Sequence, residues 1–418
     1  MRIAVLSLHT SPAAQPGAGD AGGLNVYVAA TTEALRRAGH EVVVFTTAPE
    51  ILEPRTEHLP SGIPVHVLPR HAEDKVALHR EVPALARAIA AHPDFRDTDL
   101  VWAHYWISAL AALDIRDGSA TPGTPQVAVT FHTIGAVKDR DTGTPAEPQV
   151  RLDAEAQIAS AADVLVANTP AEAADMHLLL GADPDRTLVA PPGVDLHTFT
   201  PGPMQTARAD LGRTADDLLV LCVGRMQYVK GTDVAIDALA ALRSDDPALA
   251  ARVRLVVLGG ASGGVDAAAF AELARDMGIA DLVEFLPPVP PHELARWYRA
   301  ADLVVVPSRS ESFGFVAAEA QAAGVPVLAT AVGGLPHVVE AGRTGLLVEG
   351  TDPHVWAQAL AALLRDPAQR ARMGAAAHAH AAVFDWTTCV DRVLTRIGIR
   401  APESTRNGEP RDRHHAQS

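Results

Sequence analysis

Short runs of aliphatic and β-branched residues alternate along the chain with longer Ala-, Leu- and Arg-rich segments of helical period. The apolar runs are continuous, which is typical of parallel strands that are covered on both faces. The pattern predicts one series of strands at 3–7, 41–46, 65–68, 100–102, 127–131 and 164–167. It predicts a second series at 218–223, 254–258, 283–286, 303–307, 326–329 and 346–348. We therefore expect an α/β protein with two doubly wound, Rossmann-like domains.

A proline-rich segment separates the two series of strands. Pro191-Pro-Gly-Val-Asp195 is followed by Pro201-Gly202-Pro203, a strong break in the pattern. We expect an N-terminal domain at 1–200, a C-terminal domain at 201–384, a terminal helix at 385–400 and a disordered tail at 401–418. The helix is expected to pack back on the N-terminal domain. Two such domains that face each other enclose a cleft, where we expect the ligand.

Composition and charge narrow the range of partners. Hydrophobic residues make up 48% of the 418 residues and the net charge is −15, which argues against binding to nucleic acid or to an anionic membrane. No apolar run reaches about 18 residues, so no membrane span is predicted. The first apolar run is too short for a signal peptide, and two cysteines make no disulfide framework. We expect a cytoplasmic protein.

A glycine-rich segment precedes the first long helix. Gly17-Ala-Gly-Asp-Ala-Gly22 matches the G-x-G-x-x-G pattern, but a segment with two prolines separates it from the first strand. No acidic residue closes the second strand, so a dehydrogenase is disfavoured. The loop ends at Gly22-Gly23, directly before a helix predicted at 24–38. Backbone N–H groups at that helix start could bind phosphate, and the alternative is a loop that is merely flexible.

Charged residues follow two strands of the second domain. Arg225 and Lys230 come after the strand at 218–223, and a guanidinium and an ammonium in one loop suit a diphosphate. Glu311 and Glu319 are eight residues apart, which is about 12 Å along a helix and too far for a shared proton. They could hold two ends of one ligand. The alternative for these residues is a solvated surface, although a buried Glu319 would need a partner.

Polar and aromatic residues also follow two strands of the first domain. His132 comes after the strand at 127–131, and Trp102-Ala-His-Tyr-Trp106 overlaps the end of the strand before it. Ligand groups gather at the carboxyl ends of parallel strands, so His132 is a candidate ligand contact as well as a candidate structural histidine. None of these motifs has the spacing of a metal site, and no metal is predicted.

Together these motifs resemble the retaining GT-B glycosyltransferases of family four. The two glutamates in Glu311-Ser-Phe-Gly314 and Glu319-Ala-Gln321 match that family's signature, and the similarity covers roughly residues 1–397. The resemblance implies that the N-terminal domain binds the acceptor and the C-terminal domain the nucleotide sugar. It implies retention at the anomeric carbon, with the departing diphosphate accepting the proton of the acceptor, and no cofactor beyond the nucleotide-sugar cosubstrate.

Within that family the chain is most similar to the mycothiol-pathway branch, which transfers N-acetylglucosamine from UDP-GlcNAc to inositol 3-phosphate. The matching segments are His9 to Tyr27, His104-Tyr-Trp106, His132-Thr133, Ala136-Val-Lys138 and Gly333-Gly-Leu-Pro336. The resemblance implies catalytic roles for His132, Arg225, Lys230 and Glu311. It implies donor contacts for Gln15, Pro16, Gly22, Gly23, Val289, Ser312, Phe313, Gly314 and Glu319. It implies acceptor contacts for His9, Asp20, Asn25, His79, Tyr105, Thr133 and Arg151.

Individual roles follow from the same resemblance. Gly23, Arg225 and Lys230 would meet the donor diphosphate, Glu311 a sugar hydroxyl, and Glu319 the ribose. The positions of Tyr105, Thr133 and Arg151 would reach the acceptor phosphate.

The chain departs from that branch at one position of the acceptor site. His79, in Glu73-Asp-Lys-Val-Ala-Leu-His-Arg-Glu-Val-Pro83, stands where the branch has a lysine that binds the acceptor phosphate. Losing one charged hydrogen bond would cost about 1.5–3 kcal/mol. Lys75 or Arg80 could substitute. Val289 also departs from the branch beside the base, which leaves UDP and GDP donors open.

Two alternatives therefore stay open. One is a relative of the mycothiol enzyme in secondary metabolism, of the aminoglycoside or lincosamide type, with a thiol or unphosphorylated acceptor and a GDP-sugar donor. The other is a non-catalytic sugar-nucleotide-binding protein, against which the intact Arg225, Lys230, Glu311 and Glu319 argue. A homodimer is compatible with an exposed apolar helix face.

Overall fold

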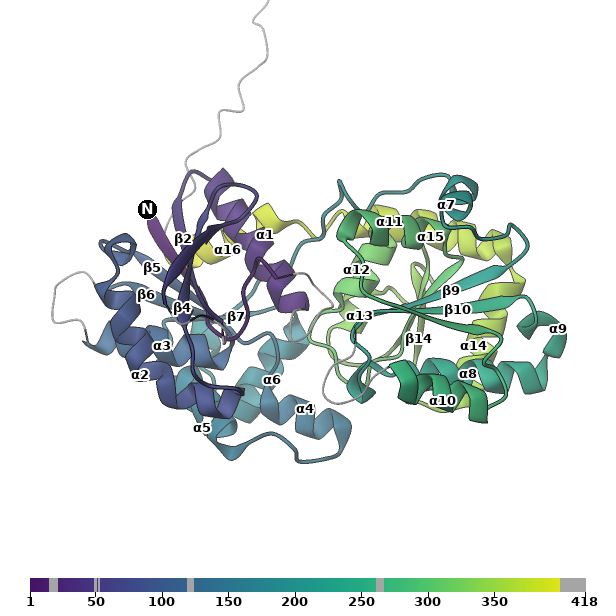
Figure 1. Cartoon of the computed structure of the whole chain (residues 1–418), viewed down its shortest axis with the longest axis horizontal. Coiled ribbons are helices and arrows are strands. Elements are labelled where there is room, and N and C mark those ends of the chain that lie inside the picture. Colours follow the sequence, from purple (N-terminus) through teal and green to yellow (C-terminus); the bar gives the residue numbers. More distant parts are fainter. Residues whose placement is uncertain (15–21, 49–50, 52, 119–123, 261–266, 399–418) are drawn as a thin grey trace, which may run out of the picture.

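The computed structural model describes residues 1–14, 22–48, 51, 53–118, 124–260 and 267–398. It contains two sheets side by side along the long axis, each with a hydrophobic core on both of its faces (Figure 1). Both sheets are parallel except for one edge strand. This arrangement confirms the predicted fold class of two doubly wound domains.

The first sheet has the order β3-β4-β2-β1-β5-β6-β7-β8. Its strands are β1 (Arg2–Ser7), β2 (Glu41–Ala48), β3 (Arg55–His58), β4 (Pro64–Pro69), β5 (Leu100–His104), β6 (Gln126–Thr130), β7 (Val164–Ala167) and β8 (Thr187–Val189). Its helices are α1 (Gly23–Arg37), α2 (Lys75–Ala91), η1 (Pro93–Phe95), α3 (Tyr105–Gly118), α4 (Gly135–Thr142), α5 (Gln149–Ala161), α6 (Pro170–Leu180) and η2 (Pro184–Arg186).

The second sheet has the order β11-β10-β9-β12-β13-β14. Its strands are β9 (Leu218–Val223), β10 (Val253–Leu258), β11 (Val283–Leu286), β12 (Leu303–Val306), β13 (Val327–Thr330) and β14 (Gly345–Val348). Its helices are α7 (Met204–Asp210), η3 (Tyr228–Lys230), α8 (Thr232–Asp245), α9 (Pro247–Ala250), α10 (Ala267–Asp276), α11 (Pro291–Ala300), α12 (Phe315–Ala322), α13 (Leu335–Val338), α14 (Pro353–Arg365) and α15 (Pro367–Ala381).

The strand order fixes where a ligand meets each sheet. In the first sheet the order reverses between β1 and β5, and in the second between β9 and β12. Loops that leave the carboxyl ends of such neighbouring strands diverge to opposite faces and open a crevice. The glycine loop follows β1, the Arg225–Lys230 loop follows β9, and the Glu311 loop follows β12. The sequence motifs therefore gather at the two switch points.

All predicted strands are present, with bounds that differ by at most two residues. The hydrophobic pattern missed two further strands. β3 is exposed or half-exposed throughout and pairs with β4 in the antiparallel direction, so it carries no apolar run. β8 has only three residues, all half-buried. Both lie at the edges of the first sheet, where burial is incomplete and the periodic signal is weak.

The last helix of the described chain returns to the first domain. α16 (Trp386–Arg396) packs against α1 and β8, and Figure 1 shows it beside α1. Its buried face consists of Trp386, Cys389, Val390, Val393 and Leu394, at helical spacing. The tail that was predicted to be disordered lies outside the described residues.

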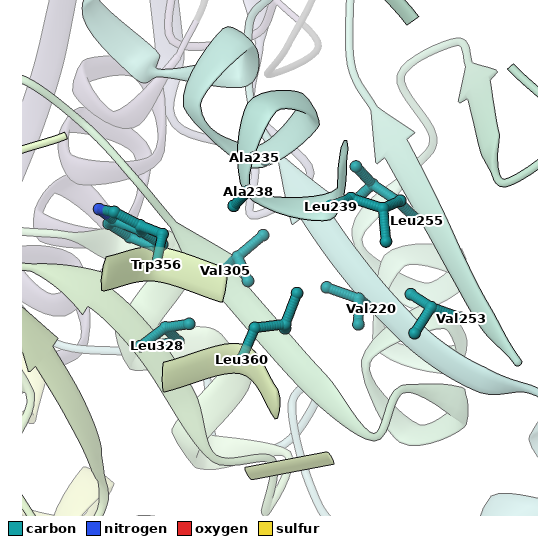
Figure 2. A pocket seen from close by; sticks show the side chains of 10 residues that line it. All are labelled: Val220, Ala235, Ala238, Leu239, Val253, Leu255, Val305, Leu328, Trp356 and Leu360. Atoms are coloured by element: carbon teal, nitrogen blue, oxygen red, sulfur yellow. The ribbon is translucent and has the colours of Figure 1, made fainter. Parts of the chain in front are cut away.

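The described core of the second domain contains a small apolar void. Side chains from β9, β10, β12 and β13 meet side chains of α8 and α14, as Figure 2 shows. The void between them measures about 10 Å³, roughly the space of one water molecule. Its lining is entirely hydrophobic: Val220, Ala235, Ala238, Leu239, Val253, Leu255, Val305, Leu328, Trp356 and Leu360. No described helix has both the length and the apolar character needed to cross a bilayer.

Candidate functional site

A cavity of about 450 Å³ lies between the two domains. Its lining residues follow β1, β4, β5, β6 and β7 of the first sheet and β9, β12 and β13 of the second. Its lining consists of His9, Gly22, Gly23, Leu24, Lys75, Tyr105, His132, Thr133, Ile134, Val137, Lys138, Arg151, Asn168, Thr169, Glu172, Asp175, Arg225, Gln227, Val229, Lys230, Ser310, Glu311, Ser312, Phe313, Phe315 and Gly333.

The cavity is richer in positive than in negative side chains. Five of the lining residues are basic and three are acidic, although the whole chain carries a net charge of −15. The negative charge of the three acidic residues is reduced further, because burial raises the pKa of Glu172 to about 7. A local concentration of cations in a chain with a negative net charge indicates an anionic ligand. The basic residues are Lys75, Lys138, Arg151, Arg225 and Lys230.

On the second domain, Lys230 and Glu311 form an ion pair at the cavity wall. The Lys230 Nζ donates to Glu311 Oε2 at 2.7 Å, and Ser308 Oγ donates to the same oxygen at 3.3 Å. Lys230 ends η3, and Glu311 lies in the loop between β12 and α12. Because β9 and β12 are neighbouring strands, two residues that are distant in sequence meet here.

The start of α1, in the first domain, lies at the cavity wall that contains Lys230 and Glu311. The backbone of Gly22 lies beside the Arg225 guanidinium, whose Nε would be 3.7 Å from an added Cβ. A Cβ on Gly23 would lie 2.9 Å from Phe315 Cδ2, so only glycine permits this approach of the domains. The first N–H groups of α1 and the Arg225 side chain thus share one corner of the cavity. Such a corner suits a phosphate.

Two cavity residues have an unusual backbone conformation. Tyr105 has φ +74° and His132 has φ +63°, each directly after or near the end of its strand. Positive φ costs a non-glycine residue about 1–2 kcal/mol, and such strain clusters at functional sites. Among the described residues, only Asp97 also combines a positive φ with a side chain. The backbone therefore aims two predicted site residues into the cavity at a cost in stability.

His132 belongs to a pair of buried imidazoles. Its Nε2 lies 3.0 Å from His104 Nδ1, and its ring packs edge-on against Tyr27 at 4.8 Å. Burial lowers the pKa of His132 to about 3 and holds that of His104 well below its usual value. Both rings are therefore neutral near pH 7, and His132 acts as a hydrogen-bonding group rather than as a cation.

Two cations approach the Tyr105 ring at the first-domain end of the cavity. The Arg151 guanidinium carbon is 5.0 Å from the centre of the Tyr105 ring, and Lys75 Nζ is 5.7 Å from it. The His9 ring packs against Tyr105 at 4.4 Å. Thr133 completes the group, since Arg151 Nη2 donates to its carbonyl at 2.8 Å and to its hydroxyl at 3.0 Å.

The charge of Arg151 is largely balanced by its neighbours. Its Nε donates to Glu155 at 2.7 Å and its Nη1 to Glu147 at 2.7 Å. These carboxylates fix the guanidinium plane but also cancel much of its attraction for an anion. Lys75, whose ammonium approaches the same Tyr105 ring, adds a second cation at this end of the cavity.

Most predicted site residues line this one cavity, including all four with predicted catalytic roles. Ser312 joins the two domains there, because its hydroxyl donates to the His132 carbonyl. The others at the cavity are His9, Gly22, Gly23, Tyr105, His132, Thr133, Arg151, Arg225, Lys230, Glu311 and Phe313. Gln15, Pro16 and Asp20 lie outside the described residues.

Five predicted contacts among the described residues do not line the cavity. Glu319 is buried and accepts from the Tyr298 hydroxyl at 2.9 Å, which supplies the partner that a buried glutamate requires. Burial raises the pKa of Glu319 to about 7. Asn25 donates to Thr10 Oγ1 at 2.9 Å. Val289 and Gly314 are likewise not among the lining residues.

His79 is the fifth of these residues. Its ring packs against Trp106 at 5.6 Å, whereas Lys75, one helical turn earlier on α2, reaches the cavity. The prediction that a residue at the His79 position contacts the ligand therefore fits Lys75 better. Lys75 lies at the first position of α2, nearer the carboxyl ends of the strands.

Sequence reasoning missed the contribution of the loop after β7. Asn168 and Thr169 line the cavity together with Glu172, whose Oε2 accepts from the Asn168 N–H at 2.6 Å. Thr169 caps α6 by accepting from the Glu172 N–H at 3.1 Å. The signal was present, since these residues follow a predicted strand and form a Thr-x-x-Glu capping pattern.

Comparison with known proteins assigns each of the two domains to a glycosyltransferase family. Residues 22–193 match the glycosyl transferase 4-like domain, and residues 203–380 match the glycosyl transferases of group 1. Two D-inositol 3-phosphate glycosyltransferases are similar over most of the chain. The Arthrobacter sp. (strain FB24) protein is 45% identical over 92% of this chain and 92% of its own length. That of Xylanimonas cellulosilytica is 46% identical over 94% of this chain and 95% of its own length.

Solved structures agree with this assignment. Sucrose-phosphate synthase from Thermosynechococcus elongatus superposes with a TM-score of 0.83 at 31% identity, over 94% of this chain and 97% of that one. Anabaena HepE in complex with UDP and glucose shares the fold, with a TM-score of 0.75 at 21% identity over 95% and 99% of the two chains. The chain therefore belongs to the GT-B glycosyltransferases, in the group whose similar curated members are named D-inositol 3-phosphate glycosyltransferase.

Proposed function

We propose that the chain transfers N-acetylglucosamine from UDP-GlcNAc to inositol 3-phosphate with retention of anomeric configuration. The observation that carries this proposal is the distribution of charge in the cavity. One group of cations, Arg225 and Lys230, lies at the second-domain wall, and Lys75 with Arg151 lies at the first-domain end. Two separate cationic groups suit a donor diphosphate and an acceptor phosphate.

The donor diphosphate occupies the corner formed by Arg225, Lys230 and the start of α1. There the guanidinium, the ammonium and the helix N–H groups compensate the charge that grows on the leaving diphosphate. When Lys230 turns to the diphosphate, Glu311 becomes available to accept a hydrogen bond from a sugar hydroxyl. These groups need no metal ion to stabilise the leaving group.

The reaction itself exchanges one bond at the anomeric carbon for another. The bond from that carbon to the diphosphate oxygen breaks, and a bond to the acceptor oxygen forms on the same face. The proton of the acceptor hydroxyl passes to the departing diphosphate. Neutral His132, near the carboxyl end of β6, hydrogen-bonds the donor sugar and orients it for attack. Catalysis then rests on positioning and on electrostatic stabilisation.

The acceptor phosphate binds beside Tyr105, between Lys75, Thr133 and Arg151. Lys75 supports this proposal over an unphosphorylated acceptor, because its ammonium approaches the same ring as Arg151 from within the cavity. The replacement of the usual lysine at His79 had favoured a different acceptor. A lysine one turn earlier on α2 supplies the missing charge from a nearby position.

Removing the Lys75 ammonium should weaken acceptor binding selectively. The Lys75→Ala variant is expected to raise KM for inositol 3-phosphate by about 10- to 100-fold, which corresponds to the loss of one charged hydrogen bond. KM for UDP-GlcNAc should change little. Steady-state kinetics with each substrate varied in turn measures both values. Arg80→Ala is the matched control, since Arg80 lies exposed on the same helix and should leave both constants unchanged.

Melting experiments distinguish the proposed ligands from the alternatives. We expect UDP and UDP-GlcNAc to raise the melting temperature, and inositol 3-phosphate to raise it further in the presence of UDP. Unphosphorylated inositol should have a much smaller effect. A larger shift with GDP-sugars would point to the secondary-metabolism alternative. No shift with any inositol phosphate would remove the proposed acceptor.

A further inference from the structure

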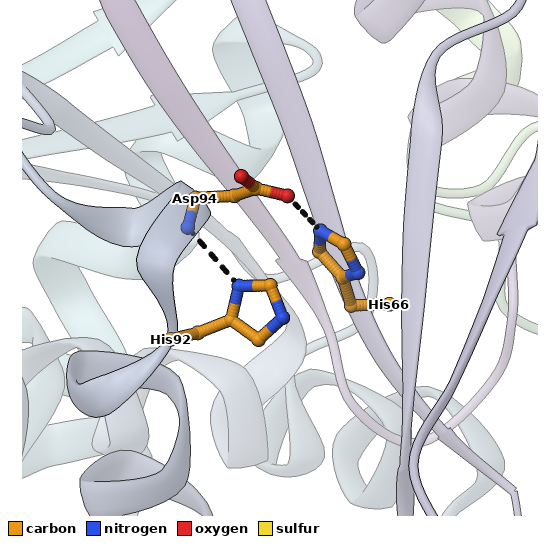
Figure 3. Close-up of side chains that lie close together, drawn as sticks. All are labelled: His66, His92 and Asp94. Carbon is orange, nitrogen blue, oxygen red and sulfur yellow. Dashed lines mark hydrogen bonds and ion pairs between the residues drawn. The ribbon is translucent and has the colours of Figure 1, made fainter.

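A group of two histidines and one aspartate lies at the end of the first domain opposite the cavity. His66 is on β4, His92 directly follows α2, and Asp94 is in η1 (Figure 3). The 17-residue helix α2 begins at Lys75, in the cavity, and ends beside His92. A helix of that length measures about 25 Å, so the group is remote from the transfer site.

The three side chains converge on one point. The Nε2 of His66 lies 2.8 Å from Asp94 Oδ2, and the two imidazole rings are 4.0 Å apart between their centres. One ligand atom of each residue lies within 4.8 Å of the others. Figure 3 shows the Asp94 carboxylate beside the His66 ring, and the backbone N–H of Asp94 donating to His92 Nδ1 at 3.2 Å. Ligand atoms around one metal ion are separated by roughly 3–4 Å, which small side-chain rotations would reach from here.

We propose that His66, His92 and Asp94 bind one divalent transition-metal ion of the zinc type. Two imidazoles and one carboxylate are ligands that Zn²⁺ prefers, whereas Mg²⁺ and Ca²⁺ prefer sites made of oxygen atoms. The fourth ligand is a water molecule, because the Asp94 side chain is 54% exposed. The ion links β4 to the turn after α2 and stabilises the outer part of the first sheet.

The surroundings of His66 suit both the metal-free and the metal-bound state. His66 is buried, and both of its ring nitrogens have hydrogen-bond partners. Without metal, the Nε2–H of His66 donates to Asp94, and the Thr56 hydroxyl donates to Nδ1 at 2.9 Å. With metal, the proton moves to Nδ1 and the Thr56 oxygen accepts it. A hydroxyl group can both donate and accept a hydrogen bond, so Thr56 serves both states. Its hydrogen bond to Nδ1 is of the kind that orients a metal-bound histidine.

The proposal is tested with the full-length protein, stripped with EDTA and dialysed. Isothermal titration with ZnCl₂ and visible spectra after addition of CoCl₂ measure stoichiometry, affinity and coordination. His92→Gln and Asp94→Asn are the informative variants, because both residues lie nearer the surface than His66 and should fold normally. The double variant His414→Gln/His415→Gln is the matched control, since this histidine pair in the tail could bind metal by itself.

We expect the wild type and the tail control to bind one Zn²⁺ per chain with equal affinity. Each site variant should bind at least tenfold more weakly and lose the cobalt spectrum of a four-coordinate site. Zn²⁺ at a hundredfold excess over its dissociation constant should raise the melting temperature by about 5 °C in the wild type only. Binding that survives in His92→Gln and Asp94→Asn, or that is lost in the tail control, overturns the proposal. So does the absence of any binding by the wild type.

Discussion

Replacing Lys230 by alanine is expected to lower kcat for sugar transfer by about 10²- to 10³-fold. The ammonium lies at the cavity wall beside Glu311, 2.7 Å from its Oε2, at the carboxyl end of the second sheet. In our proposal it compensates the charge of the leaving diphosphate, which is larger in the transition state than in the bound donor. Its removal should therefore affect kcat more strongly than KM for the donor. Initial rates at saturating substrates measure the loss.

Stability must be followed in the same experiment. Because the Lys230 side chain is 30% exposed, the substitution should leave the melting temperature nearly unchanged. Arg243→Ala is the matched control, since its ion pair with Asp281 is also at the surface of the second domain but away from the cavity. It should keep the wild-type rate. A Lys230→Ala protein with normal kcat would show that the leaving group is stabilised elsewhere.

Replacing Gly333 by alanine is expected to remove most of the activity through the backbone alone. Gly333 has φ +52°, and a Cβ there would lie 1.9 Å from the carbonyl oxygen of Glu311. The neighbouring Gly334 N–H donates to the same oxygen at 2.8 Å. The methyl group must therefore displace the Glu311 loop or the Gly333 backbone from its position at the cavity. We expect a loss of activity of about 100-fold or more, because a displacement of about 1 Å at a reacting group has that effect.

The Gly342→Ala variant separates this displacement from backbone strain. Gly342 has φ +78° in the same domain, but a Cβ there would meet nothing within 4 Å. It should lose about 1–2 kcal/mol of stability from the positive φ and retain its activity. Gly333→Ala should melt at a lower temperature than Gly342→Ala, since it adds a steric clash to the same strain. Equal activity of the two variants would contradict the proposed role of the Glu311 loop.

The hydrophobic pattern predicted the architecture well because parallel strands are buried on both faces. β9 is buried or half-buried throughout, and its apolar run is visible without any alternation. The exposed edge strand β3 has no such run, because one side of it faces solvent and its residues are polar. The strand order is not given by that pattern; it creates the two switch points, which place loops that are far apart in sequence at one cavity.

The candidate site was predicted less evenly on its two sides. Lys230 and Glu311 occupy matched positions in loops of fixed geometry, and both line the cavity. On the acceptor side, position matching pointed to His79, but the ring turns to Trp106 and Lys75 reaches the cavity. Both residues lie on α2 one turn apart, so the sequence alone could not decide between them. Which residue reaches the ligand depends on how far α2 extends toward the strand ends.

The central claim is that this cavity transfers a sugar to a phosphorylated inositol. The most direct measurement incubates the protein with UDP-GlcNAc and either inositol 3-phosphate or inositol, followed by mass spectrometry and proton NMR of the anomeric position. The account predicts UDP and one N-acetylglucosaminyl inositol phosphate with the anomeric configuration of the donor, and little or no product from inositol. Absence of product with inositol 3-phosphate, or a product of inverted configuration, would contradict it.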